Sequence, residues 1–329
     1  MHSSSELFKL LCCPRDLAPL EPGHSSLVCK EQGHVYPIIE GIPIMLVAER
    51  DPTNWNTPAS IKLADEINAG TATVPYADWD GIGVHPHLQH IIASTNGNLY
   101  KYAINKLRRY PVPDLRLPKS NGELFLDIGC NWGRWSIAAA QKGYCVVGLD
   151  PNLDAIIAAK QIANQLGLQS QFVVGDARCL PFRSSTFDRV FSYSVIQHFS
   201  KQNGSAGDAI KEISRVLVNS GSCFIQMPNR NGIRSLYNHI RDRNSTGPFR
   251  VRYWTPAELY QAFETHVGET KLSADGYFGL GIQRSDTDLM PIHFKAVVYA
   301  SEVARFVARV CPPVKYCADS LYVESRKGR

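Results

Sequence analysis

The stretch LFLDIGCNWG, residues 124–133, places a loop that contains two glycines directly after a short apolar run. The run is typical of a buried strand, and GRWSIAAAQKG, residues 133–143, has the composition of a helix. A dinucleotide-binding loop needs glycine at three positions of G-x-G-x-x-G, so that the backbone can approach a pyrophosphate. Counting from Gly129, Asn131 and Arg134 occupy the second and third of these positions. The sequence therefore predicts a loop that holds something other than a pyrophosphate.

Strand-like and helix-like segments alternate from residue 123 onward. We expect strands at ELFLDIG, YCVVGLD, SQFVVGD, FDRVFSYSVI and SCFIQMPN, and helices at GRWSIAAAQKG, LDAIIAAKQIANQLG and AIKEISRVLVNSG, the last of these ending at Gly221. Alternation at this spacing indicates a parallel sheet with helices on both faces, and apolar runs without clean alternation fit strands that are buried on both sides. The predicted fold is α/β, Rossmann-like and doubly wound.

Three aspartates follow the first three predicted strands, where ligands bind in such sheets. Asp150 is placed to accept hydrogen bonds from two ribose hydroxyls, Asp176 from an adenine amino group, and Asp127 from a cationic amine. The ligand that suits all three is an adenosine with an amino-acid tail. The alternative for any one of them is a helix N-cap.

The segments LFLDIGCNWG, VVGLD, VVGDARCLPF, FDRVFSYSVIQHF and EISRVLVNSG follow one another over roughly residues 120–228. Together they resemble the motifs of class I S-adenosylmethionine-dependent methyltransferases. The resemblance implies a mostly parallel seven-stranded sheet with an antiparallel last strand. It also implies S-adenosylmethionine as cofactor, with cofactor-binding residues Asp127, Gly129, Asn131, Trp132, Gly133, Asp150, Asp176, Ala177 and Tyr193.

Asn131 departs from the family, which usually has glycine at this position. Asparagine is the non-glycine residue that best tolerates a left-handed backbone, so we expect the shape of the loop to survive. A carboxylate and an amine need fewer close backbone approaches than a pyrophosphate. For Trp132 two interpretations stay open: it covers the cofactor, or it packs into the following helix.

The N-terminal segment contains C-P-R-D and C-x4-H, which supply Cys13, Asp16, Cys29 and His34 as candidate metal ligands. Thiolate, imidazole and carboxylate all bind zinc, usually four to a tetrahedron. The segment resembles small zinc-ribbon leaders that precede some methyltransferases, including rRNA guanine methyltransferases. Those leaders usually read CPxC and carry a second cysteine pair, whereas here Asp16 stands at the second cysteine of CPxC and Gln32 stands where a fourth cysteine would be. Both a zinc site and a metal-free ribbon therefore remain open.

The sequence suggests three regions: a leader at 1–48, a linker and helical cap at 49–120, and a methyltransferase domain at 121–329 with substrate-side insertions at 229–252 and 281–316. Within the cap, DPTNWNTPAS (51–60) has the composition of a linker, and 88–109 is expected to be helical. Near the C-terminus, WTPAEL predicts a helix start with a capping box, and ETKLSADGYF and DSLYVES predict the last two strands.

The residues expected on the substrate side follow the fourth and fifth strands. His198 is a candidate general base because the unperturbed pKa of histidine is near 6.5; its alternative is a packing or capping role. Arg230 and Arg234 open a basic stretch, through Arg252, that can hold an anionic group or form a solvated basic face. The insertion 281–316 carries an amphipathic segment, FKAVVYASEVARFVARV, which could cover the pocket or form a homodimer.

Composition sets further bounds. The formal charge is +5 and the pI is near 8.7, a smaller basic excess than is typical of nucleic-acid-binding proteins. Nine dispersed cysteines indicate a reducing compartment, so we expect a cytoplasmic protein without a membrane span. The predicted function is methylation of a small molecule, such as an anionic biosynthetic intermediate, at oxygen or nitrogen. The alternatives are methylation of rRNA or tRNA, and a catalytically silent protein that keeps the cofactor fold.

Overall fold

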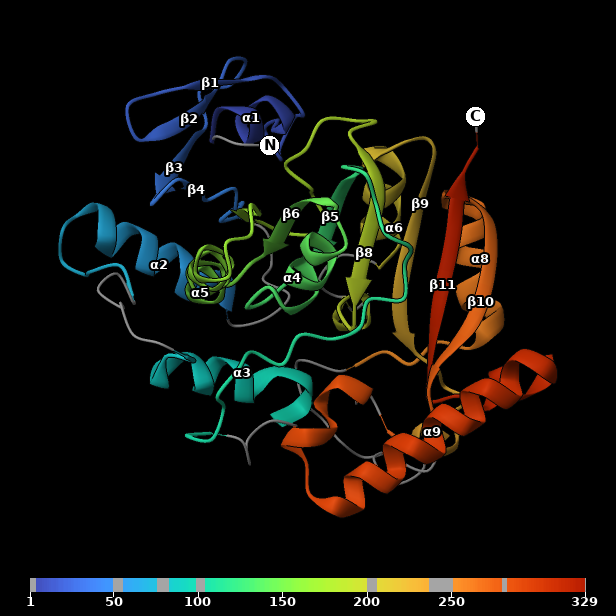
Figure 1. Cartoon of the computed structure of the whole chain (residues 1–329). Coiled ribbons are helices and arrows are strands. Elements are labelled where there is room, and N and C mark those ends of the chain that lie inside the picture. The colour runs from blue at the N-terminus through green and yellow to red at the C-terminus, as the bar shows by residue number, and fades with distance from the viewer. Residues whose placement is uncertain are drawn as a thin grey trace.

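The computed structural model describes residues 4–49, 56–75, 83–98, 104–199, 206–236, 251–279 and 283–328. Its centre is a seven-stranded sheet of order β10-β11-β9-β8-β5-β6-β7 (Figure 1). The strands are β5 (Leu124–Ile128), β6 (Cys145–Asp150), β7 (Gln171–Val174), β8 (Phe187–Tyr193), β9 (Leu217–Pro228), β10 (Gly268–Gly276) and β11 (Ser320–Lys327). Strands β5 to β9 pair in parallel, and β11 runs antiparallel to both of its neighbours. The predicted Rossmann-like fold is confirmed.

Helices cover both faces of this sheet. They are α4 (Arg134–Gln141), α5 (Leu153–Gln165), α6 (Ala206–Val216) and α8 (Pro256–His266). Alternate residues of β5 show the two faces: Phe125 packs with Trp135 of α4, whereas Leu126 belongs to the core that includes Ile210 of α6 and Leu259 of α8. Helix α8 begins with Thr255 as N-cap and has the predicted capping box with Glu258.

The prediction that the helix of 209–221 ends at Gly221 is wrong. Helix α6 ends at Val216, and strand β9 begins at Leu217. A longer helix would need the carbonyls of its last turn for its own N–H groups. Instead, the Arg215 and Val216 carbonyls accept hydrogen bonds from the Ser185 and Thr186 N–H groups, at 2.9 and 2.8 Å. Contacts distant in sequence therefore set this boundary.

The helical cap also differs from expectation. Helix α2 (Asn56–Asn68) begins within the predicted linker 51–60, because Pro58 is compatible with the first turn of a helix. Helix α3 (Pro86–Asn98) occupies the first part of the predicted helix 88–109. Residues 104–109 form turns instead of continuing the helix. The Leu107 N–H donates to the side chain of Gln89 on α3 at 3.4 Å, which partly fixes these turns.

The N-terminal leader contains α1 (Ser4–Leu10) and a four-stranded antiparallel sheet of β1 (Leu20–Pro22), β2 (Ser26–Cys29), β3 (Val35–Ile39) and β4 (Ile42–Pro43). It packs against the larger domain beside β6 and β7 (Figure 1). The Cys12 N–H donates to the Pro181 carbonyl at 3.0 Å, and the Arg183 N–H donates to the Leu10 carbonyl at 2.9 Å. Leu7 and Leu11 are fully buried in the shared core. The leader is therefore docked on the larger domain.

The insertion at 281–316 lies along the end of the sheet where the parallel strands finish (Figure 1). Its described part consists of the 3-10 helix η3 (Arg284–Leu289), helix α9 (Ile292–Val310) and the 3-10 helix η4 (Pro312–Cys317). Among the described residues, no helix combines the length and apolar character that crossing a bilayer requires. Most of the basic stretch after Asn229, including His239, Arg241, Arg243 and Arg250, lies outside the described residues.

Candidate functional site

The loop after β5 has the backbone shape that its sequence predicts. Asn131 has φ 49°, so the asparagine does adopt the left-handed conformation, and Gly129 and Gly133 have φ 73° and 82°. A Cβ on Gly129 would lie 2.2 Å from Cγ2 of Val195, so glycine is required there for space as well as for conformation. The Asn131 side chain accepts from the Trp132 N–H at 2.8 Å, which fixes the turn from inside.

Asp150 is connected to this loop. Its Oδ2 accepts from the Asn131 N–H and its Oδ1 from the Asn152 N–H, each at 2.9 Å. Burial raises the pKa of Asp150 to about 6, although the two backbone hydrogen bonds act in the opposite direction. The two backbone N–H groups thus orient this carboxylate at the end of β6, the position at which the sequence predicts ribose binding.

Asp127 is a buried carboxyl group at the start of the same loop. Oδ2 accepts a hydrogen bond from the Ser136 hydroxyl at 2.7 Å. Burial raises the pKa of Asp127 to about 7, and the neighbouring Asp150 contributes in the same direction. A desolvated acid of this kind is stabilised by a cation, so the site fits a ligand with an ammonium group. The structure thus brings Asp127, Asp150 and the loop together at one edge.

Two other predicted cofactor residues have partners within the protein. Asp176 is bound by Arg178, whose Nη2 lies 2.6 Å from Oδ2, and both side chains are buried. An adenine amine at Asp176 would share this carboxylate with the guanidinium. Trp132 is fully buried beside Leu88, Ile92 and Ile162 of the flanking helices, as the packing interpretation expects. Ala177 is buried next to Asp176.

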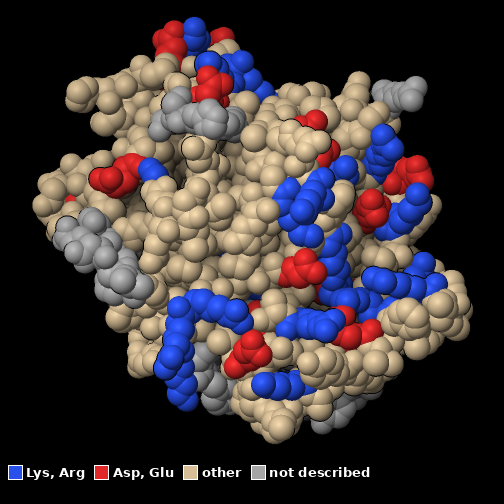
Figure 2. Space-filling view, viewed as in Figure 1, with Lys and Arg blue, Asp and Glu red and all other residues tan. Residues whose placement is uncertain are grey.

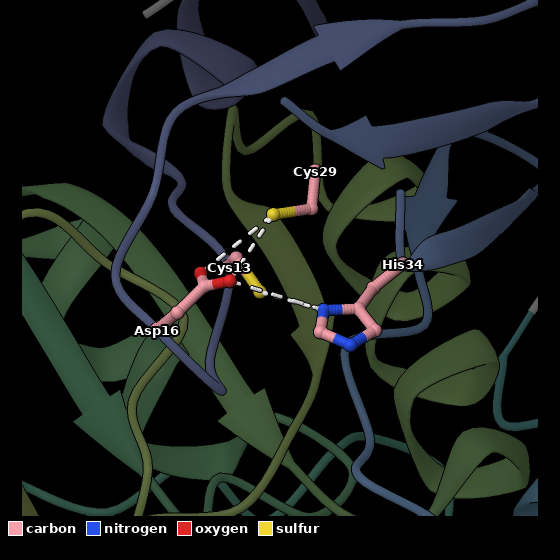
Figure 3. A group of neighbouring side chains, drawn as sticks. All are labelled: Cys13, Asp16, Cys29 and His34. Carbon is pink, nitrogen blue, oxygen red and sulfur yellow. Dashed lines mark hydrogen bonds and ion pairs between the residues drawn. The ribbon is translucent and has the colours of Figure 1, made fainter. Parts of the chain in front are cut away.

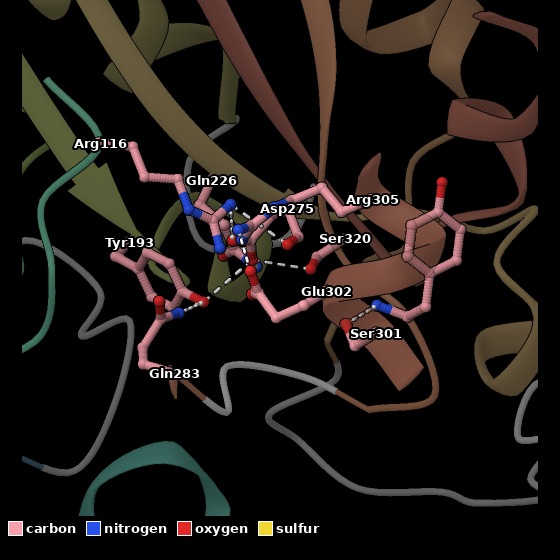
Figure 4. A network of polar contacts seen from close by, with 10 residues as sticks. Arg116, Tyr193, Gln226, Asp275, Gln283, Ser301, Glu302, Arg305 and Ser320 are labelled. Carbon is pink, nitrogen blue, oxygen red and sulfur yellow. Dashed lines mark hydrogen bonds and ion pairs between the residues drawn. The ribbon is translucent and has the colours of Figure 1, made fainter. Parts of the chain in front are cut away.

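A buried polar network centres on Asp275, at the carboxyl end of β10 (Figure 4). Its carboxylate accepts from Tyr193 Oη at 2.9 Å, Gln226 Nε2 at 3.2 Å, Ser320 Oγ at 2.9 Å and Arg116 Nη1 at 3.0 Å. Asp275 is 3% exposed, so the positive charge of Arg116 compensates a carboxylate held out of water. The network joins four strands, β8, β9, β10 and β11, at the edge where Tyr193 was expected to line the cofactor and substrate.

The insertion closes over this network. Gln283 Nε2 donates to Tyr193 Oη at 3.0 Å, and Asp286 lies 3.9 Å from Arg134 Nη2 at the start of α4. Gln283 and Asp286 are 5% and 0% exposed. Burial raises the pKa of Tyr193 well above its ordinary value, so this phenol stays a neutral hydrogen-bond donor. Gln283 and helix η3 therefore lie against Tyr193 and the start of α4.

The leader brings its four candidate ligands together (Figure 3). The donor atoms of Cys13, Asp16, Cys29 and His34 all lie within 4.8 Å of one another. The Cys13 Sγ lies 3.7 Å from His34 Nδ1, and Cys29 Sγ lies 3.4 Å from Asp16 Oδ2. A tetrahedral zinc with bonds of about 2.0–2.3 Å places its ligand atoms at similar separations. The donor set and its size fit a zinc ion.

Comparisons with known proteins agree with this geometry. A family model described as "Methyltransferase domain" matches residues 125–221, and one described as "Trm112p-like protein" matches residues 4–41. Residues 125–221 therefore form a class I S-adenosylmethionine-dependent methyltransferase domain. The leader belongs to a Trm112p-like family: the UPF0434 protein of Vesicomyosocius okutanii is 51% identical over 43 residues, which are 13% of this chain and 73% of that protein.

Curated relatives of the methyltransferase domain differ in the acceptors that their names describe. The human "Probable tRNA methyltransferase 9B" is 36% identical over 104 residues, 32% of this chain and 21% of that protein. The "Ubiquinone biosynthesis O-methyltransferase" of Azorhizobium caulinodans is 34% identical over 77 residues, 23% of this chain and 30% of that protein. The chain thus spans less than a third of the length of these two relatives.

A solved methyltransferase from Methanosarcina mazei is 19% identical, with a TM-score of 0.45, and the match covers 64% of this chain and 94% of that one.

The predicted catalytic and substrate residues lie at the carboxyl edge of this methyltransferase domain. His198 ends the 3-10 helix η2 (Ile196–His198) just after β8, and its side chain is exposed. Arg230 and Arg234 are also exposed, and Arg234 Nη1 donates to the Phe278 carbonyl at 3.2 Å. Among the described residues, no hydrogen bond or ion pair joins these three side chains to the Asp275 network. Their roles remain predictions.

Four residues of this site were not predicted from the sequence: Asp275, Arg116, Gln283 and Asp286. Asp275 had a usable signal, because it lies near the carboxyl end of the predicted strand ETKLSADGYF, as the three selected aspartates lie near the ends of theirs. Arg116 lies in the proline-rich segment before the domain, and its partner is 159 residues away. Local spacing carries no information about such a pair.

Proposed function

We propose that the chain transfers the methyl group of S-adenosylmethionine to a small molecule held between the cofactor loop and Asp275. The observation that carries the proposal is the closure of η3 over a buried polar site: Gln283 contacts Tyr193, and Asp286 lies near Arg134. A covered site of this kind suits an acceptor that can be enclosed. A polynucleotide needs an open, basic approach.

In this proposal the cofactor supplies an electrophilic methyl group, and the chain's residues bind and orient. Asp127 pairs with the ammonium, Asp150 accepts from the ribose hydroxyls, and the loop from Gly129 to Gly133 surrounds the methionine portion. Asp176 and Ala177 border the adenine, which requires Arg178 to share the Asp176 carboxylate. The support is the common edge on which these groups lie.

The acceptor side has fewer assigned roles. Tyr193 and Asp275 form a polar wall that can orient an oxygen or nitrogen acceptor. His198 is a candidate general base beyond that wall, and Arg230 and Arg234 are candidate anchors for an anionic acceptor. The exposed positions of the last three suit an acceptor that enters from solvent and carries its charge at the rim.

RNA is the second candidate acceptor, and the Trm112p-like leader and the tRNA methyltransferase name among the relatives favour it. A silent cofactor-fold protein is the third hypothesis. For the leader we propose bound zinc, supported by the compact Cys13, Asp16, Cys29 and His34 cluster. The nine cysteines are all free thiols, which supports a cytoplasmic setting. A homodimer through 281–316 stays a prediction.

The test is transfer of label from methyl-labelled S-adenosylmethionine into a cell extract separated into small molecules, RNA and protein. The proposal expects enzyme-dependent label in the small-molecule fraction, with an activity that salt from 50 to 200 mM changes little. Label in RNA, with an affinity that falls steeply with salt, would favour the second candidate. Cofactor binding without transfer to any fraction would favour the silent protein.

A further inference from the structure

Helix α9 turns an apolar stripe toward solvent. The stripe consists of Ile292, Tyr299, Val303, Phe306 and Val310, which we call the outer stripe. Their exposed fractions are 84%, 54%, 64%, 63% and 71%. The spacings of seven, four, three and four residues keep all five on one side of a helix with 3.6 residues per turn. A 19-residue helix is about 28 Å long, so the stripe is a continuous feature of the surface.

The opposite side of α9 is the one that packs on the protein. Val298 and Ala308 are buried, and the Ser301 hydroxyl accepts from the Tyr277 N–H at 2.9 Å. The inner side is thus fully used, while the outer stripe has no covering element in the described part of the chain. Exposed apolar surface of this extent and order is typical of an interaction site.

The charges around the outer stripe are mainly basic. From Ile292 to Cys317 the chain has four lysines and arginines and one acidic residue, Glu302. Glu302 is ion-paired with Arg305, whereas Lys295 and Arg309 form no salt bridge with any described residue. In the view of Figure 2, blue side chains border the tan surface where α9 crosses the lower part of the molecule. The surface that the stripe meets should therefore be apolar and negatively charged.

A second copy of this chain fits less well. Two-fold pairing of α9 through its middle, near Ser301, would run the helices antiparallel. The N-terminal end of one helix would then face the C-terminal end of the other, which places His293 and Lys295 beside Arg309. The like charges would oppose that contact.

We propose that α9 lies in the interface of a bilayer that contains anionic phospholipids, with the outer stripe among the acyl chains and Lys295 and Arg309 at the headgroups. An in-plane helix of this kind combines apolar anchors with basic residues at its borders. The docked helix would hold the carboxyl edge of the sheet close to the lipid surface, since Ser301 on its inner side bonds to Tyr277, the residue directly after β10. Lipid binding needs no turnover, so its outcome is separate from that of the proposed methyl transfer.

The experiment is co-flotation of the purified full-length chain with vesicles of phosphatidylcholine alone or with 30% phosphatidylglycerol. We expect binding to the mixed vesicles and at least tenfold weaker binding to phosphatidylcholine. Val303→Glu should reduce binding at least tenfold. Val35→Glu is the matched control, because Val35 is 62% exposed on β3 of the leader, and it should bind like the parent chain. Circular dichroism and the Tm verify that each variant is folded.

A second variant tests the charge. Lys295→Ala combined with Arg309→Ala should lower binding to the mixed vesicles at least fivefold and leave the fold intact. Equal binding by the parent chain, Val303→Glu and Val35→Glu would overturn the proposal. A second result would also overturn it: the parent chain binds neither vesicle type, and analytical ultracentrifugation shows a stable dimer that Val303→Glu dissociates. That result would assign the outer stripe to a second copy.

Discussion

The backbone N–H of Asn131 donates to Oδ2 of Asp150 at 2.9 Å, so the loop after β5 and the acid after β6 are held as one unit. Asn131 reaches this position in a left-handed conformation with φ 49°. Any change that moves its backbone therefore also changes the orientation of the carboxylate expected to bind the ribose.

The first prediction compares two substitutions of this residue. Asn131→Gly should preserve the left-handed backbone and keep the affinity for S-adenosylhomocysteine within about threefold, because glycine adopts this conformation freely. Asn131→Val should lower the affinity by about 1–2 kcal/mol, the cost of forcing a branched residue into this region. Isothermal calorimetry measures both. Equal losses in the two variants would show that the backbone shape is not the important property.

The second prediction concerns pH. Asp127 and Asp150 have pKa values raised to about 7 and about 6, and a ligand with an ammonium and ribose hydroxyls needs them ionised. The affinity for S-adenosylhomocysteine should therefore rise about tenfold or more from pH 5 to pH 8. Asp127→Asn should remove the part of this rise that lies near pH 7. A flat profile in the parent chain would contradict the pairing.

The same groups affect stability in the opposite direction. The folded state retains their protons to a higher pH than the unfolded chain, whose aspartates titrate near 4. Their contribution to the free energy of unfolding should therefore be favourable at low pH and decrease as the pH rises from about 4 to about 7. Urea unfolding with and without ligand would show the decrease, and bound ligand should reduce it.

The third prediction concerns the leader. Purified protein should contain one zinc per chain, because four suitable donor atoms lie within 4.8 Å of one another. Cys29→Ser should remove the metal, whereas Cys311→Ser, at an exposed cysteine of the insertion, should retain it. Elemental analysis decides the matter. Well-folded parent protein without metal would establish the metal-free ribbon instead.

The fourth prediction tests the Asp275 network. Tyr193→Phe removes a donor to the buried Asp275 carboxylate and the acceptor of Gln283, so it should lower the free energy of unfolding by about 1–3 kcal/mol. Tyr260→Phe is the matched control, because Tyr260 is 45% exposed on α8. Urea unfolding measures the difference. Identical stabilities would mean that the hydroxyl bonds to water equally well when the chain is unfolded.

Much of the fold follows from local pattern. The alternation of apolar runs and helical segments predicted the strands β5 to β9 and the helices between them, because strands buried on both faces have a distinctive composition. The end of α6 escaped prediction, since Ser185 and Thr186 capture its last carbonyls from another part of the chain. The spacing of residues within the helix does not reveal hydrogen bonds that its carbonyls make to a distant segment.

Part of the candidate site could also be predicted from the sequence, and part could not. Asp127 and Asp150 could be selected because each follows a strand, and the sheet places strand ends together. The lid contacts of Gln283 and Asp286 depend on how the insertion folds back over β8 and α4. The pairing of Arg178 with Asp176 was not predicted either, although the two residues are only two positions apart. This bond reduces the capacity of the Asp176 carboxylate to accept hydrogen bonds from a ligand.

The central claim is that this edge binds S-adenosylmethionine through Asp150, and calorimetry with S-adenosylhomocysteine tests it most directly. The parent chain should bind with micromolar affinity, about −8 kcal/mol. Asp150→Ala should lose about 1.5–3 kcal/mol, as expected for hydrogen bonds to a charged group. Asp114→Ala should bind like the parent chain, because Asp114 is a surface acid with 84% of its side chain exposed. Unchanged affinity in Asp150→Ala would contradict the account.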